Sequence, residues 1–437
     1  MDDTRISIRL TPEEHTQLKT LVAKRRTKIN QFVHDFIRNE IDAEKTVVLN
    51  KAKAGARVLS LFANIGVAEA YFEEIGINIV LANELVKRRA DLYSQLYPDA
   101  EMKCGDITDK KLQDYLIARG KELGVNIIMA TPPCQGMSTA GKQEEDDIRN
   151  NLIVPVVRMV KELAPKYVFI ENVPMFLQTE ICVNGKKIII PEYLKQELGT
   201  NYEFKINKID TKHYGVPQTR ERAIILLTRR DMTHQWLVPV KESKIVTMFD
   251  AIGHLPPLDP FVRDVSREEL LRMFPKYEER AREASKISRW HFPPEHIRRQ
   301  VEVMMHTPTG CTAFDNEKEF QPQKDNGELV KGFRNTYKRQ DWDTPAYTVT
   351  MDNRKISSQN NVHPGRPIGT DEKGNVLYSD ARTLTVYELM LISSIPGSWP
   401  LPADTPPAFL RSIIGEGIPP LFVKKVFEQL RGVDWSN

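Results

Sequence analysis

The chain has 437 residues, of which 41% are hydrophobic and 28% charged, as is typical of a globular protein large enough for two or three domains. The net charge is only +3, so binding to nucleic acid would have to rely on local basic patches. The four cysteines form no CxxC or Cys/His pair at zinc spacing, and no apolar run approaches about 18 residues, which argues against a structural metal, a disulfide scaffold and a membrane span.

The first 42 residues predict a strand followed by two helices. Residues 4–10 alternate polar and apolar side chains, which is the period of a β-strand. Thr11, Pro12 and Glu14 predict a helix start, with Thr11 as N-cap and Glu14 completing a capping box. After a basic turn, Asn30 predicts the cap of a second amphipathic helix. The apolar stripe of that helix would be Phe32, Val33, Phe36 and Ile37.

Apolar strands then alternate with helical patterns from residue 56 to about residue 229. The predicted strands are 57–62, 78–82, 125–130, 167–170 and 222–228, with helices such as 85–96 and 152–163 between them. This alternation predicts a doubly wound, parallel α/β sheet of the Rossmann type. Residues 231–380 are rich in proline, glycine and charge and predict a smaller irregular domain, and a helical pattern returns after Arg382 and ends in 419–430.

A cysteine follows the third predicted strand at a stiff turn. Pro132 and Pro133 restrict the backbone just before Cys134, and small and polar residues come after it. A thiol displayed at the carboxyl end of a strand is placed for nucleophilic attack, because the thiolate needs access to its target. For an isolated cysteine the alternative is a small buried residue in a loop.

Three other strand ends carry residues suited to a nucleotide-like ligand. The turn at 62–66 would expose helix N–H groups, Glu84 would suit a ribose diol, and Asp106 with Ile107 could meet an adenine amine. Each of these features alone is also explained by a plain turn, a solvated acid or a helix cap. Together they favour a binding site, because ligands of open α/β sheets bind at the carboxyl edge.

An acid and two arginines complete the set of chemical groups. Glu171 follows the apolar strand at 167–170, where partial burial would help it hold a proton for donation to a ring nitrogen. Arg220 and Arg222 alternate at a strand start, so both would point one way, toward a phosphate or a carbonyl oxygen. An exposed edge strand is the alternative interpretation of this arginine pair.

These motifs, in this order, resemble those of the DNA cytosine-5 methyltransferases over about 56–230 and 380–432. The similar segments are Pro132-Pro133-Cys134-Gln135, Glu171-Asn172-Val173 and Gln218-Thr219-Arg220-Glu221-Arg222 and, more loosely, Arg382-Thr383-Leu384-Thr385 and Gly415-Glu416-Gly417-Ile418-Pro419-Pro420. The resemblance implies methyl transfer from S-adenosylmethionine to C5 of a flipped-out cytosine, with Cys134 adding to C6. Glu171 would hold the N3 and amino edge, Arg222 would contact O2, and Arg220 would brace the site or the backbone.

The resemblance also implies which residues hold the cofactor and the DNA. The cofactor residues would be Phe62, Ala63, Asn64, Gly66, Glu84, Asp106, Ile107, Pro133, Leu152 and Glu416. The DNA contacts of the catalytic domain would be Gln135, Ser138 and Arg149. Four positions depart from the family pattern at the cofactor end: Ser60 replaces an acid, Asn64 and Val67 replace glycines, and Glu416 replaces an asparagine.

The N-terminal residues resemble a ribbon–helix–helix DNA-binding unit. In that fold two chains pair their strands into a ribbon that enters the major groove, so Arg5, Ser7 and Arg9 would face bases. We expect this unit to form a homodimer and to bind an operator, with simple dimerisation as the alternative. The expected domains are 1–45, the catalytic domain 55–230, a target-recognition domain 231–380, and 381–437 completing the catalytic domain.

The expected protein is the cytoplasmic modification enzyme of a bacterial or archaeal restriction-modification system. It would act on double-stranded DNA, without a metal or a membrane, and would be linked in function to a cognate endonuclease. Two other interpretations compete with it: an RNA cytosine-5 methyltransferase using the same thiol chemistry, and a non-catalytic DNA-binding regulator.

Overall fold

The computed structural model describes residues 10–24, 29–30, 32–33, 55–133, 151–324, 326–332, 337–353, 356 and 361–435. The chain divides into two compact units, 1–55 with 435–437 and 56–434. Within the described part, no helix is both long and apolar enough to cross a membrane. The predicted strand at 4–10 and its residues Arg5, Ser7 and Arg9 lie outside the described residues, as do Cys134, Gln135, Ser138 and Arg149.

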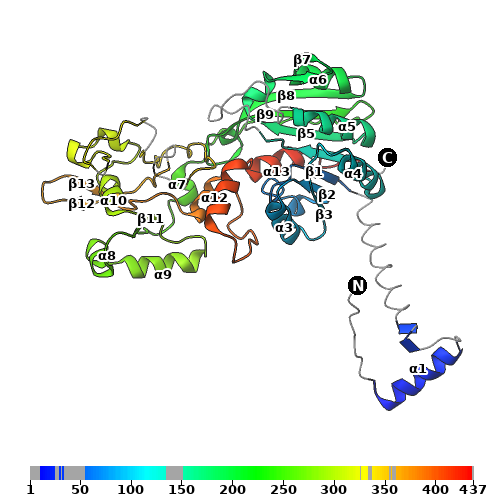
Figure 1. The fold of residues 1–437 in the computed structure, drawn as a ribbon, viewed down its shortest axis with the longest axis horizontal. Coiled ribbons are helices and arrows are strands. Elements are labelled where there is room, and N and C mark those ends of the chain that lie inside the picture. Colours follow the sequence, from blue (N-terminus) through cyan, green and yellow to red (C-terminus); the bar gives the residue numbers. More distant parts are fainter. Residues whose placement is uncertain are drawn as a thin grey trace. The chain divides into compact units, whose positions relative to one another are not determined.

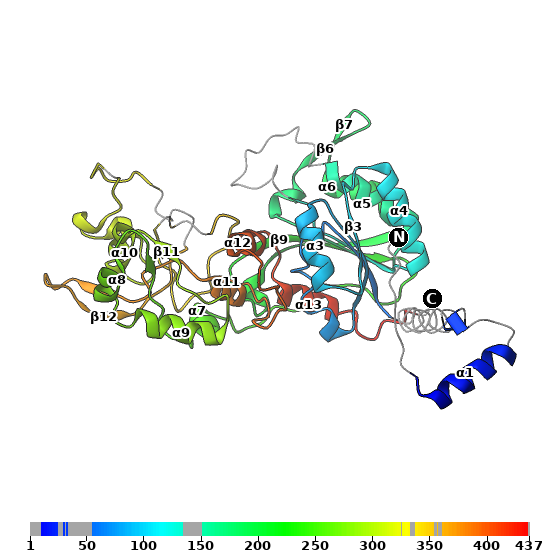
Figure 2. The ribbon, with the colours of Figure 1, turned by 60° about the horizontal axis from the view of Figure 1, so that its bottom comes forward.

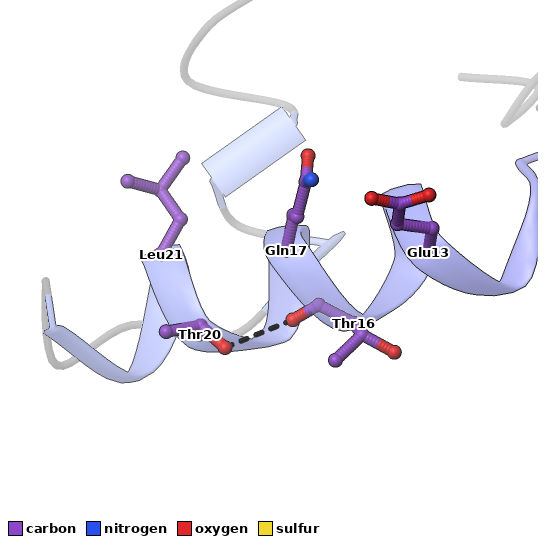
Figure 3. Close-up of a pocket in the computed structure, with 5 residues that line it drawn as sticks. All are labelled: Glu13, Thr16, Gln17, Thr20 and Leu21. Carbon is purple, nitrogen blue, oxygen red and sulfur yellow. Dashed lines mark hydrogen bonds between the residues drawn. The ribbon is translucent and has the colours of Figure 1, made fainter.

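In the first unit, helix α1 (Pro12–Lys24) begins where the sequence predicts it. The Thr11 amide donates to Glu14 Oε2 at 2.8 Å, and the Glu14 amide donates back to Thr11 Oγ1 at 3.3 Å, so the predicted capping box is confirmed. A shallow hollow along this helix is lined by Glu13, Thr16, Gln17, Thr20 and Leu21 (Figure 3). All five lining residues belong to this one helix, and the Thr20 hydroxyl donates a hydrogen bond to the carbonyl of Thr16. The ribbon–helix–helix assignment stays a prediction.

A seven-stranded sheet forms the centre of the second unit, with strand order β3-β2-β1-β4-β5-β9-β8 (Figure 1). The strands are β1 (Arg57–Leu61), β2 (Asn78–Glu84), β3 (Glu101–Cys104), β4 (Ile127–Ala130), β5 (Tyr167–Asn172), β8 (Tyr202–Asp210) and β9 (Glu221–Arg229). β2, β1, β4 and β5 are parallel, as predicted, and β3, which the sequence did not predict, adds a fifth parallel strand at the edge. β9 is antiparallel to both β5 and β8, so the sheet is mostly rather than wholly parallel.

The antiparallel direction of β9 has a local cause. β8 leads through the short helix η4 (Thr211–Tyr214) and Gly215, whose φ of 78° is left-handed, into β9. A connection this short joins antiparallel neighbours, whereas a parallel pair needs a long crossover. The alternation of Tyr202, Phe204 and Ile206 was the sequence signal for β8, which the prediction missed.

Helices cover both faces of this sheet (Figures 1 and 2). On one face, α4 (Lys110–Leu123), α5 (Ile153–Leu163) and α6 (Ile190–Leu198) pack on alternate residues of the strands, among them Leu59, Ile128 and Ile170. The other face carries α3 (Lys87–Leu96), whose Tyr93 packs on Ala82, and α13 (Pro420–Glu428), whose Phe427 lies 5.7 Å from Phe169 between ring centroids. The C-terminal part of the chain, which contains α13, therefore packs back against the sheet.

Short elements make up the region between β9 and the last helices. They are α7 (Met248–Ile252), β10 (Phe261–Val262), α8 (Arg267–Met273), α9 (Tyr277–Ile287), β11 (Glu295–His296), α10 (Arg298–Met305), β12 (Pro367–Thr370) and β13 (Val376–Tyr378), followed by α11 (Val386–Ile392) and α12 (Pro407–Glu416). β12 and β13 form a hairpin. Earlier in the chain, β6 (Glu180–Val183) and β7 (Lys186–Ile189) form another hairpin, whose turn is an Asn-Gly pair with left-handed backbone. The Asn-Gly pair is a sequence signal for a hairpin, but this hairpin was not predicted. The predicted boundaries between the catalytic and recognition parts stay a prediction.

A buried ionic cluster links this irregular region to α11. The Arg382 guanidinium donates to both Glu388 oxygens at 2.8 Å and to Asp380 Oδ1 at 2.8 Å, and all three side chains are at most 3% exposed. His363 packs beside them, and burial lowers the pKa of His363 to about 4, so its ring is neutral near pH 7. The fully buried Arg339 donates to backbone carbonyls, including that of His363 at 2.6 Å. The cluster is a structural junction between the two regions.

Candidate active site

The carboxyl ends of five parallel strands and the start of β9 meet at one edge of the sheet. Because β9 runs in the opposite direction to β5, its first residues pair with the last residues of β5. In the order of the sheet, the residues at this edge are Asp106 after β3, Glu84 ending β2, Asn64 after β1, Pro133 after β4, Glu171 in β5 and Arg222 in β9. The structure thus brings these six predicted site residues to the same edge of the sheet.

An ion pair lies at the end of this line where β5 meets β9. Arg222 Nε is 2.7 Å from Glu171 Oε1, and the two residues are 9% and 8% exposed. Burial raises the pKa of Glu171, and the nearby Arg222 and Arg220 oppose that rise without cancelling it. A carboxyl group in this setting is suited to hold a proton and share it with a basic ring nitrogen.

The Pro132-Pro133 turn is linked to the strand that carries Glu171 by the side chain of Asn172. Asn172, the residue after Glu171, donates from Nδ2 to the carbonyl of Pro132 at 3.0 Å and accepts from the Val173 amide at 2.8 Å. The residues immediately before Cys134 are therefore held next to Glu171. Asn172 belongs to the Glu171-Asn172-Val173 motif, but its hydrogen bond to Pro132 was not predicted from the sequence.

Arg220 braces backbone rather than the ion pair. Its guanidinium donates to the carbonyls of Val349 and Gly415 at 2.8 Å each and to that of Glu416 at 3.1 Å, and the residue is 2% exposed. Gln218, two residues earlier, donates to Ser393 Oγ at 3.1 Å and accepts from the Val349 amide at 3.2 Å. This motif therefore ties the segment around residue 349 and the end of α12 to the edge of the sheet.

The turn after β1 has the unusual backbone that a close ligand requires. Phe62, Asn64 and Gly66 have positive φ values of 59°, 53° and 84°. A Cβ on Gly66 would lie 2.0 Å from the Tyr97 ring, so only glycine fits there. The Asn64 amide donates to Glu84 Oε2, and the Val86 amide donates to Glu84 Oε1, each at 2.9 Å. Both oxygens of Glu84 are thereby oriented at the edge.

The remaining predicted cofactor residues surround this turn. Ile107 is buried, whereas Asp106 is exposed and its Oδ1 accepts from the Thr108 amide at 2.8 Å. Helix α3 starts at Lys87, two residues after the predicted start, because Val86 has extended backbone and its amide donates to Glu84. Ala63 is buried, Leu152 precedes α5 as its N-cap and Pro133 is exposed.

Each departure from the family pattern has a partner in the structure. Ser60 donates to Glu69 Oε1 at 2.6 Å. Glu69, in the turn after β1, therefore supplies a carboxylate next to the position where the family usually has an acid. Val67 lies against Gly417, where an added Cβ would be 3.1 Å from Val67 Cγ1. Asn64 Nδ2 donates to Glu416 Oε2 at 3.2 Å. Glu69 was not predicted as a site residue, although its acidic side chain in an otherwise apolar turn was the available signal.

Glu69 should make the stability of the protein depend on pH. It is 2% exposed, and burial raises its pKa to about 7, while the unfolded chain would titrate near 4.5. The folded state holds this proton more tightly, so the free energy of unfolding should fall as pH rises from about 4.5 to 7, by about 3 kcal/mol at most. Glu69→Gln keeps a carbonyl oxygen for Ser60 and removes the titration.

We therefore expect Glu69→Gln to be more stable than the parent above pH 7 and nearly equal to it at pH 5. Urea unfolding between pH 5 and pH 8 measures this difference. The exposed Glu73→Gln is the matched control, whose curve should follow that of the parent. Parallel curves for Glu69→Gln and its parent across this range would contradict the prediction.

The chain is similar to known proteins over most of its length. A family model for C-5 cytosine-specific DNA methylases matches residues 56–432. The type II methyltransferase M1.HgaI of Avibacterium volantium is 41% identical over 381 residues, covering 85% of this chain and 97% of that protein. The type II methyltransferase M1.HphI of Haemophilus parahaemolyticus is 26% identical over 379 residues, covering 85% of each chain.

Solved structures share the fold. A candidate DNA modification methyltransferase encoded within an E. coli prophage superposes with a TM-score of 0.58 at 16% identity, covering 87% of this chain and 99% of that chain. The Entamoeba histolytica methyltransferase EhMeth gives a TM-score of 0.51 at 15% identity, covering 86% and 97%. With the family match spanning most of the second unit, these results show that the chain belongs to the C-5 cytosine-specific DNA methylase family, the DNA cytosine-5 methyltransferases.

Proposed function

We propose that this chain transfers the methyl group of S-adenosylmethionine to C5 of a cytosine flipped out of duplex DNA. The observation that carries the proposal is the buried Glu171–Arg222 ion pair beside the backbone that leads into Cys134. A cytosine ring needs an acid at N3 and a donor at O2 once a thiolate has added to C6, and these two side chains offer both. The relatives named type II methyltransferases support a role in a restriction-modification system, next to a cognate endonuclease.

The side chains of this protein would act in the following order. The Cys134 thiolate forms a bond to C6 while Glu171 gives a proton to N3, and C5 becomes nucleophilic. When bound, S-adenosylmethionine supplies the methyl group that C5 takes up as the methyl–sulfur bond breaks. A base then removes the C5 proton, the Cys134–C6 bond breaks with the electron pair returning to sulfur, and the N3 proton returns to Glu171. Arg222 holds O2 throughout, and Arg220 acts as a positioning residue.

The residues at the sheet edge fit the cofactor. Glu84 keeps both oxygens oriented by backbone amides, and each carboxylate oxygen retains a lone pair for a ribose hydroxyl. Leu85 is 62% exposed, which leaves an apolar surface beside Glu84 for an adenine ring. The left-handed turn at Phe62–Gly66 brings its backbone close to whatever lies over β1.

Residues 231–380 would recognise the target sequence, and Gln135, Ser138 and Arg149 would contact the DNA near the extruded base. Bisulfite sequencing of DNA from cells expressing the full chain tests the proposal directly. We expect protected cytosines at one short sequence. Complete conversion of genomic DNA, or protection confined to RNA, would contradict it and favour the regulator or the RNA-methylating alternative respectively.

Glu171→Gln should slow methyl transfer by about 10²–10⁴-fold, because the amide cannot donate a proton to N3 with the facility of a carboxyl group. Transfer of labelled methyl groups to duplex DNA measures the rate under single-turnover conditions. The exposed Glu203→Gln on β8 is the matched control and should leave the rate unchanged. An unchanged rate for Glu171→Gln would remove this residue from the proton transfer.

We also propose that the N-terminal unit pairs with a second copy and binds operator DNA. The strand–helix–helix pattern of the sequence and the capping box that starts α1 support this proposal. Deleting residues 1–45 should leave methylation largely intact and abolish binding to promoter DNA. Electrophoretic mobility shift with the promoter of the protein's own gene measures the second effect. Promoter binding that survives the deletion would exclude the repressor role.

A further inference from the structure

An ion pair that the sequence analysis did not foresee lies beside the turn after β1. Arg89 Nη2, in α3, is 2.8 Å from Glu416 Oε1 at the end of α12, and the two side chains are 23% and 20% exposed. Ser412 Oγ lies 3.4 Å from the same Glu416 oxygen. Since both charges remain partly accessible, the pair can interact with a ligand at this edge.

Asn64 joins this pair to the cofactor turn. Its Nδ2 donates to Glu416 Oε2 at 3.2 Å, and its backbone amide donates to Glu84 Oε2 at 2.9 Å. Its Oδ1 is buried and has no hydrogen-bond partner among the described residues. A buried acceptor without a donor is unfavourable, so this oxygen points to a ligand that brings an N–H group.

The order of the strands decides which part of the ligand lies here. Asp106, Glu84 and Asn64 follow β3, β2 and β1, which are adjacent in that order, and β4 with Pro133 comes next. On the proposed function, adenine lies at β3, ribose at β2 and the reacting methyl group toward β4. The α-amino-acid end of S-adenosylmethionine, which branches from the sulfur next to the ribose, is then closest to β1.

We propose that Arg89 and Glu416, with Asn64, recognise the zwitterionic α-amino-acid end of the cofactor. The guanidinium of Arg89 binds the carboxylate, and the Glu416 carboxylate and Asn64 Oδ1 accept from the ammonium group. A paired guanidinium and carboxylate matches a zwitterion in both charges, and charge-assisted hydrogen bonds of this kind are strong. This assignment rests on the proposed function and gives Glu416 and Asn64 a shared purpose at the positions that depart from the family pattern.

Calorimetric titration of the full chain with two ligands tests the assignment. S-Adenosylhomocysteine carries the α-amino-acid end, whereas 5′-methylthioadenosine lacks it and keeps the adenosine. We expect Arg89→Gln and Glu416→Gln each to weaken S-adenosylhomocysteine binding by about tenfold or more and to leave 5′-methylthioadenosine binding unchanged. Unchanged binding of the second ligand also shows that the variants are folded.

Arg88→Gln is the matched control, since Arg88 is the adjacent residue of α3 and stacks over Phe409 at 4.2 Å instead. It should bind both ligands like the parent. The charge-exchanged double variant Arg89→Glu/Glu416→Arg keeps an ion pair but reverses its direction, so it should remain as weak as the single variants. Recovery of affinity in the double variant, or equal losses for both ligands, would overturn the proposal. A parent chain that binds neither ligand would instead contradict the proposed function.

Discussion

Cys134→Ser is expected to reduce DNA methylation by about a thousandfold or more, because a serine hydroxyl does not ionise near neutral pH and cannot replace the thiolate that adds to C6. The variant should still bind duplex DNA, since base flipping and phosphate contacts do not require the sulfur. Transfer of labelled methyl groups to a duplex carrying the target sequence measures the loss.

The covalent step has its own readout and control. In the presence of S-adenosylmethionine, a duplex with 5-fluorocytosine at the target position should form a denaturation-resistant adduct with the parent chain and none with Cys134→Ser. After methyl transfer, the C5 fluorine cannot be removed as the proton is, so the bond from Cys134 to C6 cannot be eliminated. Cys182→Ser replaces an exposed cysteine on β6 and should react like the parent. Normal turnover by Cys134→Ser would end the covalent mechanism, whatever the outcome for the other residues.

Arg382→Met should destabilise the protein by about 3–5 kcal/mol, because it leaves the buried carboxylates of Glu388 and Asp380 without their cation. Arg382 lowers the pKa values of both acids in the parent. The parent therefore has this stabilisation at neutral pH and loses it only in strong acid. In the variant, the carboxyl groups of Glu388 and Asp380 either stay charged without a cation or take up protons. Taking up protons is easier in acid, so the loss of unfolding free energy should be largest at neutral pH and smaller at pH 4. Urea unfolding at these two pH values measures it.

Arg267→Met is the matched control for this effect. Arg267 pairs with Glu278 on the surface, where the two side chains are 80% and 52% exposed. Exposed pairs of this kind contribute about 1 kcal/mol or less, so the control should unfold almost like the parent. Equal losses for the two variants would show that the cluster of Arg382, Glu388 and Asp380 does not hold the irregular region to α11.

Much of the fold could be predicted from local sequence patterns. The strands around Leu59, Ile128 and Phe169 were predictable because burial on both faces leaves continuous apolar runs. The capping box was predictable because its two residues, Thr11 and Glu14, lie within one turn. β3 was missed because a short edge strand with partly exposed side chains carries a weak periodic signal. The start of α3 was two residues off because Glu84 holds the Val86 amide in extended backbone.

The kinds of chemical group in the site, and the family of the protein, could be predicted from the amino-acid sequence, since Cys134, Glu171 and the two arginines stand in short ordered motifs. Which of these groups lie in contact depends on how the chain folds. The direction of β9 brings Arg222 to Glu171, and the folding back of the chain places Glu416 against Asn64 and Arg89, more than 300 residues away in sequence. Pairings of this kind depend on strand direction and long-range packing, and no local pattern of residues encodes them.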